Sequence, residues 1–382
     1  MDTKILIGAD IVPTKSNYVE FIEGNVESLV GKTMCDLLHE MDFTIFNLEV
    51  PLTDVISPLQ KCGPNLQALS KTINGIKKLN PYFFTLANNH ILDQSVQGLK
   101  STMEILNREN IKYAGAGNDL KEASKPFVFE KNGIKIGIYC CAEREFSIAT
   151  ENKAGANPFD PLFSLDHIRL LKKDVDYVIV LYHGGKEHYR FPSPNLQKTC
   201  RRIVDSGADL VVCQHSHCIG CYEDWETGKI IYGQGNFLFD DSDSEFWKTS
   251  LLIEIIFKSK NDFSIEYIPI IKVGNGIRLA ENEKKVEIIN GFEDRSKRII
   301  ESAFIEAEYS KFAQQYINTY LRTGMPHNTS LFNRVFNKLS KGTWFERRIT
   351  KEQKLALCNY LECEAHRELF LQGLKESLRK SS

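Results

Sequence analysis

Short apolar segments alternate with helix-length amphipathic segments from the N-terminus to about residue 240. This alternation constrains the chain most, because it is typical of stacked strand-helix units and predicts an α/β fold. The clearest strands are expected at residues 4–8, 43–47, 82–87, 175–182 and 210–214. Helical periodicity covers residues 65–79, 95–110, 165–173 and 194–206.

Residues 127–141 follow a different pattern. Asn132-Gly133 lies between two β-rich runs there, which is a strong signal for a tight hairpin. Three further strands are expected at residues 230–239, 250–257 and 263–271. A hairpin and terminal strands favour a four-layer α/β/β/α sandwich with two mixed sheets over a single parallel sheet.

After about Asn282 the alternation of strands and helices gives way to charged sequence with helical periodicity. A chain of 382 residues exceeds what one core usually fills. Residues 283–382 contain 18 Lys and Arg against 13 Asp and Glu, a net charge of +5, which leaves −7 for residues 1–282. We expect a first domain at residues 1–282 and a helical appendage at 283–382 that caps the sandwich, or that supports oligomers or docks a partner. Removing the appendage should leave the site described below intact.

Composition excludes collagen-like, disordered and disulfide-scaffold proteins. With 42% hydrophobic residues, 26% charged residues and a net charge of −2, the chain has the composition of a soluble globular protein, and nonspecific nucleic-acid binding is not expected. No apolar stretch is long enough to span a membrane, and the first ten residues do not resemble a signal peptide. Ten scattered cysteines are typical of reduced thiols, so we expect a cytoplasmic location.

Polar residues of the types that bind metal ions follow five of the apolar segments. They are Asp10, Glu49, Asn89 with His90, His183, and His215 with His217. Because the carboxyl ends of strands in open α/β folds meet at one crevice, these residues should lie together. Carboxylate, amide and imidazole groups without thiolate suit Mn, Fe, Zn or Mg. Their number exceeds what one tetrahedral ion needs, so two divalent ions sharing a bridging carboxylate are expected.

Six motifs in order resemble a known family. They are Gly8-Ala9-Asp10, Asn47-Leu48-Glu49, Ala87-Asn88-Asn89-His90, His183-Gly184-Gly185, His215-Ser216-His217 and Gly233-Gln234-Gly235-Asn236-Phe237. Together they resemble the capsule-synthesis protein CapA family, which is associated with poly-γ-glutamate and other capsule polymers. That family is similar in fold to the calcineurin-like metallophosphoesterases. The resemblance covers roughly residues 4–240 and does not include the helical region.

The resemblance implies a role for each residue. Asp10 and His217 would bind the first ion, and Asn89, His183 and His215 the second. Glu49 stands where a bridging aspartate is usual, and Val12 stands where the first motif normally has a histidine, which leaves operation with one ion or none open. His90 would orient or protonate the leaving group.

Four further residues are weaker candidates. Glu187 could act as a base or substrate contact, and His188 as a substrate contact. Lys61 could meet an anionic substrate, although a solvated loop lysine is the alternative. Asn236 could hydrogen-bond a ligand or a metal-bound histidine. Cys218 and Cys221 form a C-x-x-C without a second pair, which we interpret as accidental.

Three functions remain in competition. The first is a two-metal hydrolase that acts on a phosphoester or amide of a capsule, poly-γ-glutamate or exopolysaccharide precursor. The second is a non-catalytic assembly subunit of a capsule or polymer synthesis complex, with the synthesis proteins as partners. The third is a general cytosolic phosphoesterase. Retention of His90 beside the ligand set favours a hydrolase, because a structural metal site needs no additional imidazole.

Overall fold

The computed structural model describes residues 2–324, 335–336, 338–340, 349–362 and 364–380. Contacts within the chain divide it into two units, Met1–Glu306 and Ala307–Ser382. Both large sheets and all the candidate site residues belong to the first unit.

The first sheet has eight strands in the order β16-β15-β14-β1-β2-β3-β4, with β13 paired to β1. Strands β1 to β4 and β13 are parallel, whereas β14, β15 and β16 are antiparallel, so the sheet is mixed. The bounds are β1 (Thr3–Val12), β2 (Phe43–Leu48), β3 (Phe83–Thr85), β4 (Lys112–Ala114), β13 (Asn236–Phe239), β14 (Thr249–Ser259), β15 (Asp262–Val273) and β16 (Gly276–Leu279).

The second sheet has six strands in the order β11-β12-β10-β9-β7-β6. Its central strands are parallel and its two edge strands antiparallel, so it is mixed as well. The bounds are β6 (Phe127–Lys131), β7 (Ile134–Ala142), β9 (Tyr177–His183), β10 (Leu210–Gln214), β11 (Tyr222–Trp225) and β12 (Gly228–Tyr232). A small third sheet pairs β5 (Ala116–Gly117) with β8 (Gly155–Ala156).

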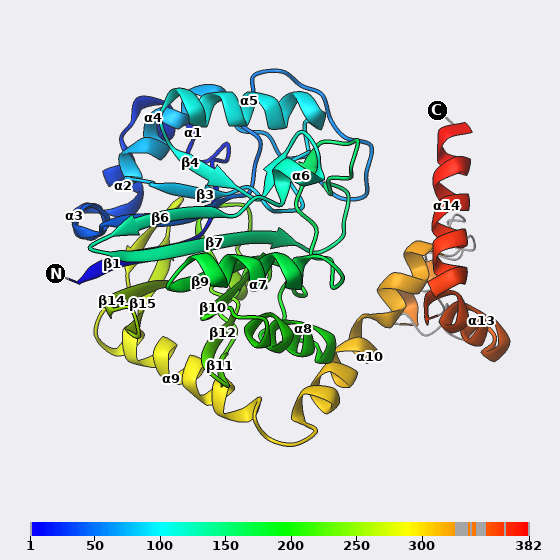
Figure 1. Ribbon diagram of the computed structural model, residues 1–382. Coiled ribbons are helices and arrows are strands. Elements are labelled where there is room, and N and C mark those ends of the chain that lie inside the picture. Colours follow the sequence, from blue (N-terminus) through cyan, green and yellow to red (C-terminus); the bar gives the residue numbers. More distant parts are fainter. Residues whose placement is uncertain (1, 325–334, 337, 341–348, 363, 381–382) are drawn as a thin grey trace. The chain divides into compact units, whose positions relative to one another are not determined.

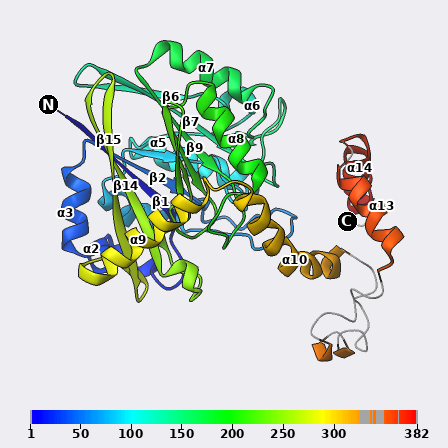
Figure 2. The same ribbon diagram turned by 90° about the horizontal axis from the view of Figure 1, so that it is seen from below.

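Helices cover the outer faces of the two large sheets (Figures 1 and 2). The first sheet is covered by α1 (Tyr18–Glu23), α2 (Val26–Val30), α3 (Lys32–Glu40), α4 (Ile73–Ile76) and α5 (Ser95–Arg108). The second sheet is covered by α7 (Ser164–Asp174) and α8 (Pro194–Asp205). Short elements elsewhere are α6 (Leu120–Ala123), η1 (Ser70–Thr72), η2 (Lys77–Leu79) and η3 (Glu245–Trp247).

Three apolar cores separate the four layers. One lies between the first sheet and its helices, one between the two sheets, and one between the second sheet and its helices. On β1, Ile5 and Ile7 enter the core between the sheets, whereas Leu6 enters the core under the helices. Strands buried on both faces read as continuous apolar runs. The predicted α/β/β/α sandwich is confirmed.

Two predicted segments differ from the structure. The expected helix at residues 65–79 begins only at Ser70, because Asn65–Leu69 forms part of a loop that is hydrogen-bonded to residues near His90. The expected strand at 230–239 is two strands in different sheets. Gly233 and Gly235, with φ of 113° and 84°, break it. The hairpin at Asn132-Gly133 is confirmed.

Helix α9 (Asn282–Arg298) belongs to the sandwich. Its residues Ile288, Phe292 and Ser296 are buried, and the Phe292 ring packs on Tyr222 of β11 and Tyr267 of β15 at 5.2 and 4.9 Å between ring centroids. The predicted domain boundary at residue 282 therefore precedes a helix whose buried face completes the first unit, which ends at Glu306.

Truncation should distinguish these two boundaries. We expect a chain ending at residue 306 to melt near the temperature of the full chain, measured by circular dichroism. A chain ending at residue 282 should melt clearly lower, because losing Phe292 alone removes a contribution of about 3–5 kcal/mol. Equal melting temperatures for the two truncations would show that α9 adds nothing to the sandwich.

The remaining helices are α10 (Phe304–Gly324), α13 (Lys351–Glu362) and α14 (Glu364–Lys380). Tyr360 and Phe370 join α13 and α14 at a centroid distance of 6.0 Å. Leu361 of α13 and Leu369, Leu374 and Leu378 of α14 are exposed apolar residues. Within the described ranges, no helix is both long and apolar enough to cross a bilayer.

The cysteines of the described ranges are free thiols. Cys140, Cys141, Cys200, Cys213, Cys218 and Cys221 are buried, whereas Cys363 lies outside the described residues. Burial raises the pKa of Cys218 to about 11 and the pKa of Cys221 well above its usual value. Such thiols are unreactive, as expected of core residues.

Candidate metal centre

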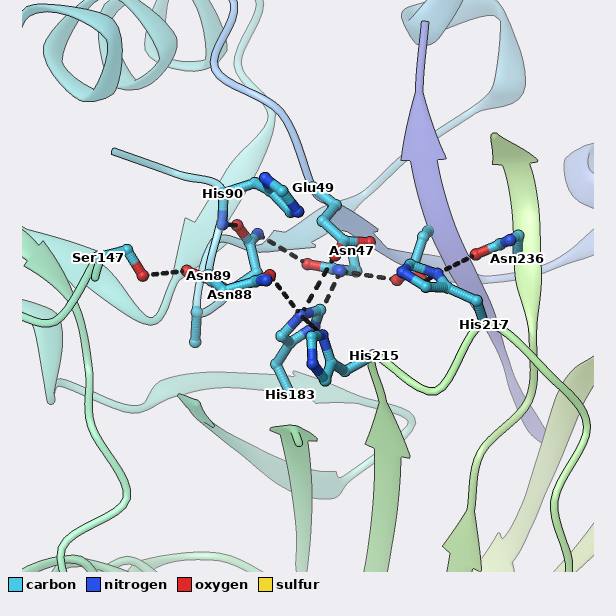
Figure 3. A network of polar contacts seen from close by, with 12 residues as sticks. Asn47, Glu49, Asn88, Asn89, His90, Ser147, His183, His215, His217 and Asn236 are labelled. Carbon is cyan, nitrogen blue, oxygen red and sulfur yellow. Dashed lines mark hydrogen bonds and ion pairs between the residues drawn. The ribbon is translucent and has the colours of Figure 1, made fainter. Parts of the chain in front are cut away.

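The carboxyl ends of parallel strands from both large sheets meet at one place (Figure 3). The first sheet contributes Asp10, Glu49, Asn89 and His90, and the second contributes His183, His215 and His217. His183 Nε2 lies 3.1 Å from His215 Nδ1 and 3.0 Å from Asn89 Oδ1. The predicted convergence of the strand ends is present in the structure, whereas the roles of the individual residues stay predictions.

The two carboxylates of the cluster are buried without hydrogen-bond donors on most of their oxygens. Glu49 and Asp10 have no exposed surface. Both oxygens of Glu49 and Oδ2 of Asp10 have no hydrogen-bond partner. A buried carboxylate in this condition is costly unless a cation compensates it. The donor set therefore fits a bound divalent cation.

Burial and the neighbouring Asp10 carboxylate raise the pKa of Glu49 well above its usual value. Two carboxylates at such close range cannot both ionise easily in a protein interior. A divalent cation between them would reverse this preference and hold both in the ionised form. Without a cation, the site should bind at least one additional proton.

Two of the three imidazoles are in the neutral state that metal ions require. Burial, followed by the neighbouring imidazoles, lowers the pKa of His183 and of His215 well below the usual value. Neutral imidazole is the ligand form of histidine. Glu49, His215 and His217 each place one ligand atom within 4.8 Å of the others. His215 and His217 have φ of 89° and 51°, a backbone conformation that clusters at functional sites.

His217 is held by Asn236 on β13. Its Nδ1 lies 2.8 Å from Asn236 Oδ1 and 3.5 Å from Asp10 Oδ2. Burial lowers the pKa of His217, but the nearby Asp10 carboxylate, together with the hydrogen bond to Asn236, outweighs burial and raises it. Because Asn236 Oδ1 accepts the Nδ1 proton, Nε2 is left as the ligand atom. Of the two roles expected for Asn236, the structure shows the contact with a histidine.

Replacing Asn236 by alanine should therefore weaken metal binding by about 10- to 100-fold, the usual effect of removing a group that orients a ligand. Isothermal titration with Mn²⁺ would measure it. Asn236→Asp is the matched control, because its carboxylate still accepts the proton and should retain most of the affinity. Equal losses in both variants would contradict an orienting role.

Asn47 connects the two halves of the cluster and was not predicted as a site residue. Its Nδ2 donates to Asp10 Oδ1 at 2.7 Å and lies 3.3 Å from His183 Nδ1, and its Oδ1 accepts from Asn88 Nδ2 at 3.0 Å. In β2 it lies directly beside Asp10 of β1. The available signal was an asparagine inside an otherwise apolar strand, since a polar group buried there needs polar partners.

His90 belongs to a buried group of three charged or polar side chains. Its Nδ1 lies 2.6 Å from Asp93 Oδ2, and Lys61 Nζ lies 2.5 Å from Asp93 Oδ1 and 3.5 Å from His90 Nδ1. The Lys61 side chain is only 3% exposed. The interpretation of Lys61 as a solvated loop lysine is therefore wrong, and its ammonium group is paired with Asp93. A contact between Lys61 and an anionic substrate stays a prediction. Asp93 was missed, although it lies one turn after His90.

The last two predicted residues lie at the opposite side of the cluster. His188 Nε2 accepts a hydrogen bond from Trp247 Nε1 at 2.8 Å, and its role as a substrate contact stays a prediction. Trp247 packs on His217 at a centroid distance of 4.9 Å. Glu187 is exposed, and its charge contributes to the raised pKa of Glu49 and of His217. A catalytic role for Glu187 stays a prediction.

Two mixed sheets between helices, with carboxylates, amides and imidazoles at their joined strand ends, define a four-layer α/β sandwich with a candidate metal centre. A family model described as "Bacterial capsule synthesis protein PGA_cap" matches residues 10–241, which is more than half of the chain. The chain therefore belongs to this capsule synthesis protein family.

Curated relatives carry related names. The chain is 31% identical over 239 residues to "PGA biosynthesis protein CapA" of Bacillus subtilis (strain 168), which covers 61% of this chain and 62% of that protein. It is 28% identical over 242 residues to "Capsule biosynthesis protein CapA" of Bacillus anthracis, covering 61% of this chain and 59% of that protein. The matches thus span about three fifths of the length of these relatives.

Solved structures of phosphoester-cleaving enzymes are also similar to the chain. A phosphatase from Mycoplasma pneumoniae matches with a TM-score of 0.44 and 15% identity, covering 71% of this chain and 94% of that one. A 5'-nucleotidase from Candida albicans matches with a TM-score of 0.40 and 13% identity, covering 84% of this chain and 59% of that one.

Proposed function

We propose that this protein is a metal-dependent hydrolase of a phosphoester in the synthesis or processing of a bacterial capsule polymer. The observation that carries the proposal is the set of buried carboxylate oxygens of Asp10 and Glu49 that have no hydrogen-bond partner and lie among three imidazoles. Membership of the capsule synthesis family and the names of its relatives support the biological context.

The residues divide into those that hold ions and those that handle the substrate. Asp10, Glu49, Asn89, His183, His215 and His217 would bind one or two divalent ions, with Mn, Fe, Zn and Mg all compatible with these donors. Ions bound there supply Lewis-acid polarisation of the phosphoryl group and a hydroxide-like nucleophile. Asn47 fixes Asp10 and His183 relative to each other.

His90 is suited to transfer a proton to the leaving group. Asp93 engages its Nδ1, so Nε2 is the nitrogen that remains for a substrate. Lys61 gives Asp93 a permanent positive partner, so the carboxylate does not depend on His90 for its charge balance. His90 can then exchange a proton with the substrate without leaving Asp93 as an uncompensated buried charge.

Metal analysis and a substrate screen on the same purified samples test the proposal. We expect bound divalent metal and metal-dependent cleavage of phosphoesters, with γ-glutamyl peptides screened in parallel for amide cleavage. Loss of turnover in EDTA and recovery with Mn²⁺ would support it. Full metal content without turnover on any substrate would favour an assembly subunit that acts with capsule synthesis proteins.

A further inference from the structure

An open cleft of about 820 Å³ lies beside the candidate metal centre. It is lined by the end of β1 and the loop after it, the loop before η1, the end of β13 and the loop after it, and β15. A phosphoryl group alone occupies a small part of such a volume, whereas pockets of this size accommodate ligands of several connected rings or residues.

The walls of the cleft contact both halves of the site. Val12 and Phe239 are register partners at the ends of β1 and β13, immediately beyond Asp10 and Asn236. The Phe239 ring packs on His217 at 5.6 Å between centroids. On the other wall, the Leu66 backbone N–H donates to Asp93 Oδ2 at 2.6 Å. A substrate reacting between His217 and His90 therefore has this cleft as the adjacent space for its remaining part.

The charges on the walls nearly cancel. Lys272 Nζ lies 2.5 Å from Asp240 Oδ1 and donates to the Ser242 carbonyl oxygen at 2.9 Å, so its charge is already paired. Lys272 Nζ also lies 3.7 Å from Asp243 Oδ1, so the other charged side chains on the walls are Lys15 and Asp241, both exposed. Among the described residues that line the cleft, positive charge is thus not in surplus, and residues 1–282 carry a net charge of −7.

This charge pattern opposes a polyanionic ligand. A groove that holds a polycarboxylate chain needs an excess of Lys or Arg, because like charges on the walls repel it and suppress binding. The cleft instead offers the rings of Tyr18 and Phe239. It also has the hydroxyls of Thr14 and Ser16, which contact each other at 2.9 Å, while Ser16 donates to Asp240 Oδ2 at 2.5 Å, so their remaining lone pairs can accept hydrogen bonds. Rings and neutral hydrogen-bonding groups suit an uncharged, hydroxyl-rich ligand.

Building on the proposed function, we infer that the cleft binds an uncharged oligosaccharide portion of the substrate and excludes a polyglutamate chain. The substrate class is then a phosphoester carried on a neutral glycan, with the anionic group at the metal centre and the sugar units in the cleft. Specificity follows from the walls, which act on parts of the substrate that do not react.

Binding by the full-length protein tests this inference without requiring turnover. Isothermal titration with chitotetraose, an uncharged tetrasaccharide, and with γ-linked tetraglutamate should show affinity at least about tenfold higher for the sugar. The double variant Asp241→Lys/Asp243→Lys should gain at least about tenfold in tetraglutamate affinity. Asp262→Lys, which alters charge at the opposite end of β15, is the matched control and should gain nothing.

A second variant tests the location. Leu69→Trp places a bulky side chain in the cleft wall and should abolish chitotetraose binding while leaving hydrolysis of p-nitrophenyl phosphate unchanged, because that small ester does not reach the cleft. Tetraglutamate binding to the unmodified protein as tight as chitotetraose binding, or absence of chitotetraose binding, would overturn the inference. Chitotetraose binding without hydrolysis of any phosphoester would overturn the proposed function and leave the cleft assignment standing.

Discussion

Replacing His90 by alanine should lower phosphoester turnover by about 10²- to 10⁴-fold, the usual loss when a proton-transferring side chain is removed. Metal content should stay nearly unchanged, because Asp93 and Lys61 engage His90 Nδ1 and His90 is not in the group of Glu49, His215 and His217 whose ligand atoms lie within 4.8 Å of one another. Turnover and bound metal are to be measured on the same samples, the second by plasma emission spectrometry.

His39→Ala provides the comparison, since His39 is an exposed histidine on α3, outside the candidate site, whose Nδ1 lies 2.8 Å from the Cys35 carbonyl oxygen of the same helix. It should have the activity of the unmodified protein. Unchanged turnover in His90→Ala would remove this residue from the chemistry and favour an assembly role. Loss of metal in His90→Ala would instead make His90 a ligand.

Replacing His215 by alanine should act on the metal itself. His215 Nδ1 lies 3.1 Å from His183 Nε2, and its ring belongs to the group that brings ligand atoms within 4.8 Å. We expect the affinity for Mn²⁺ to fall by more than about 100-fold, beyond the loss typical of an orienting residue. The stabilisation that Mn²⁺ gives the folded chain, about 2.7 kcal/mol at 100 times the dissociation constant, should disappear with it.

Thermal melting with and without Mn²⁺ measures this second effect. The unmodified protein and His39→Ala should both melt at a higher temperature when Mn²⁺ is present. An equal shift in His215→Ala would mean that the ion binds elsewhere, and the carboxylates of Asp10 and Glu49 would then need another partner.

Much of this site could be predicted because the sequence shows directly where the buried strands lie and which polar residue follows each of them. Apolar runs mark buried strands, and the polar residue after each run lies at the edge where parallel strands end. Asp10, Glu49, His183, His215 and His217 were found in this way, and the structure brings them together. The two-sheet sandwich could be predicted because the Asn132-Gly133 hairpin and the consecutive strands after residue 230 do not fit a single parallel sheet.

The features that could not be predicted depend on contacts between residues that are distant in sequence. Lys61 is buried because the loop around it is hydrogen-bonded to Asp93 and Gln94, and nothing in the local sequence distinguishes it from a solvated lysine. His188 pairs with Trp247, 59 residues later. A contact between Asn236 and a histidine was expected. The change from the second sheet to the first at Gly233 and Gly235, which places Asn236 on β13, was not predicted by the periodicity of the sequence.

Asn47 links the two large sheets at the candidate site. It lies on the first sheet and contacts His183 of the second, and the polar cluster around it occupies the seam where the inter-sheet core ends. A cation bound by carboxylates from one sheet and imidazoles from the other would link the two sheets at the edge where their strands end, although the described strands of the two sheets share no backbone hydrogen bonds. Without the cation, the Glu49 carboxyl, whose pKa is raised, would remain buried at that edge. The two layers should then begin to separate there, and this local opening should depend on both pH and cation concentration.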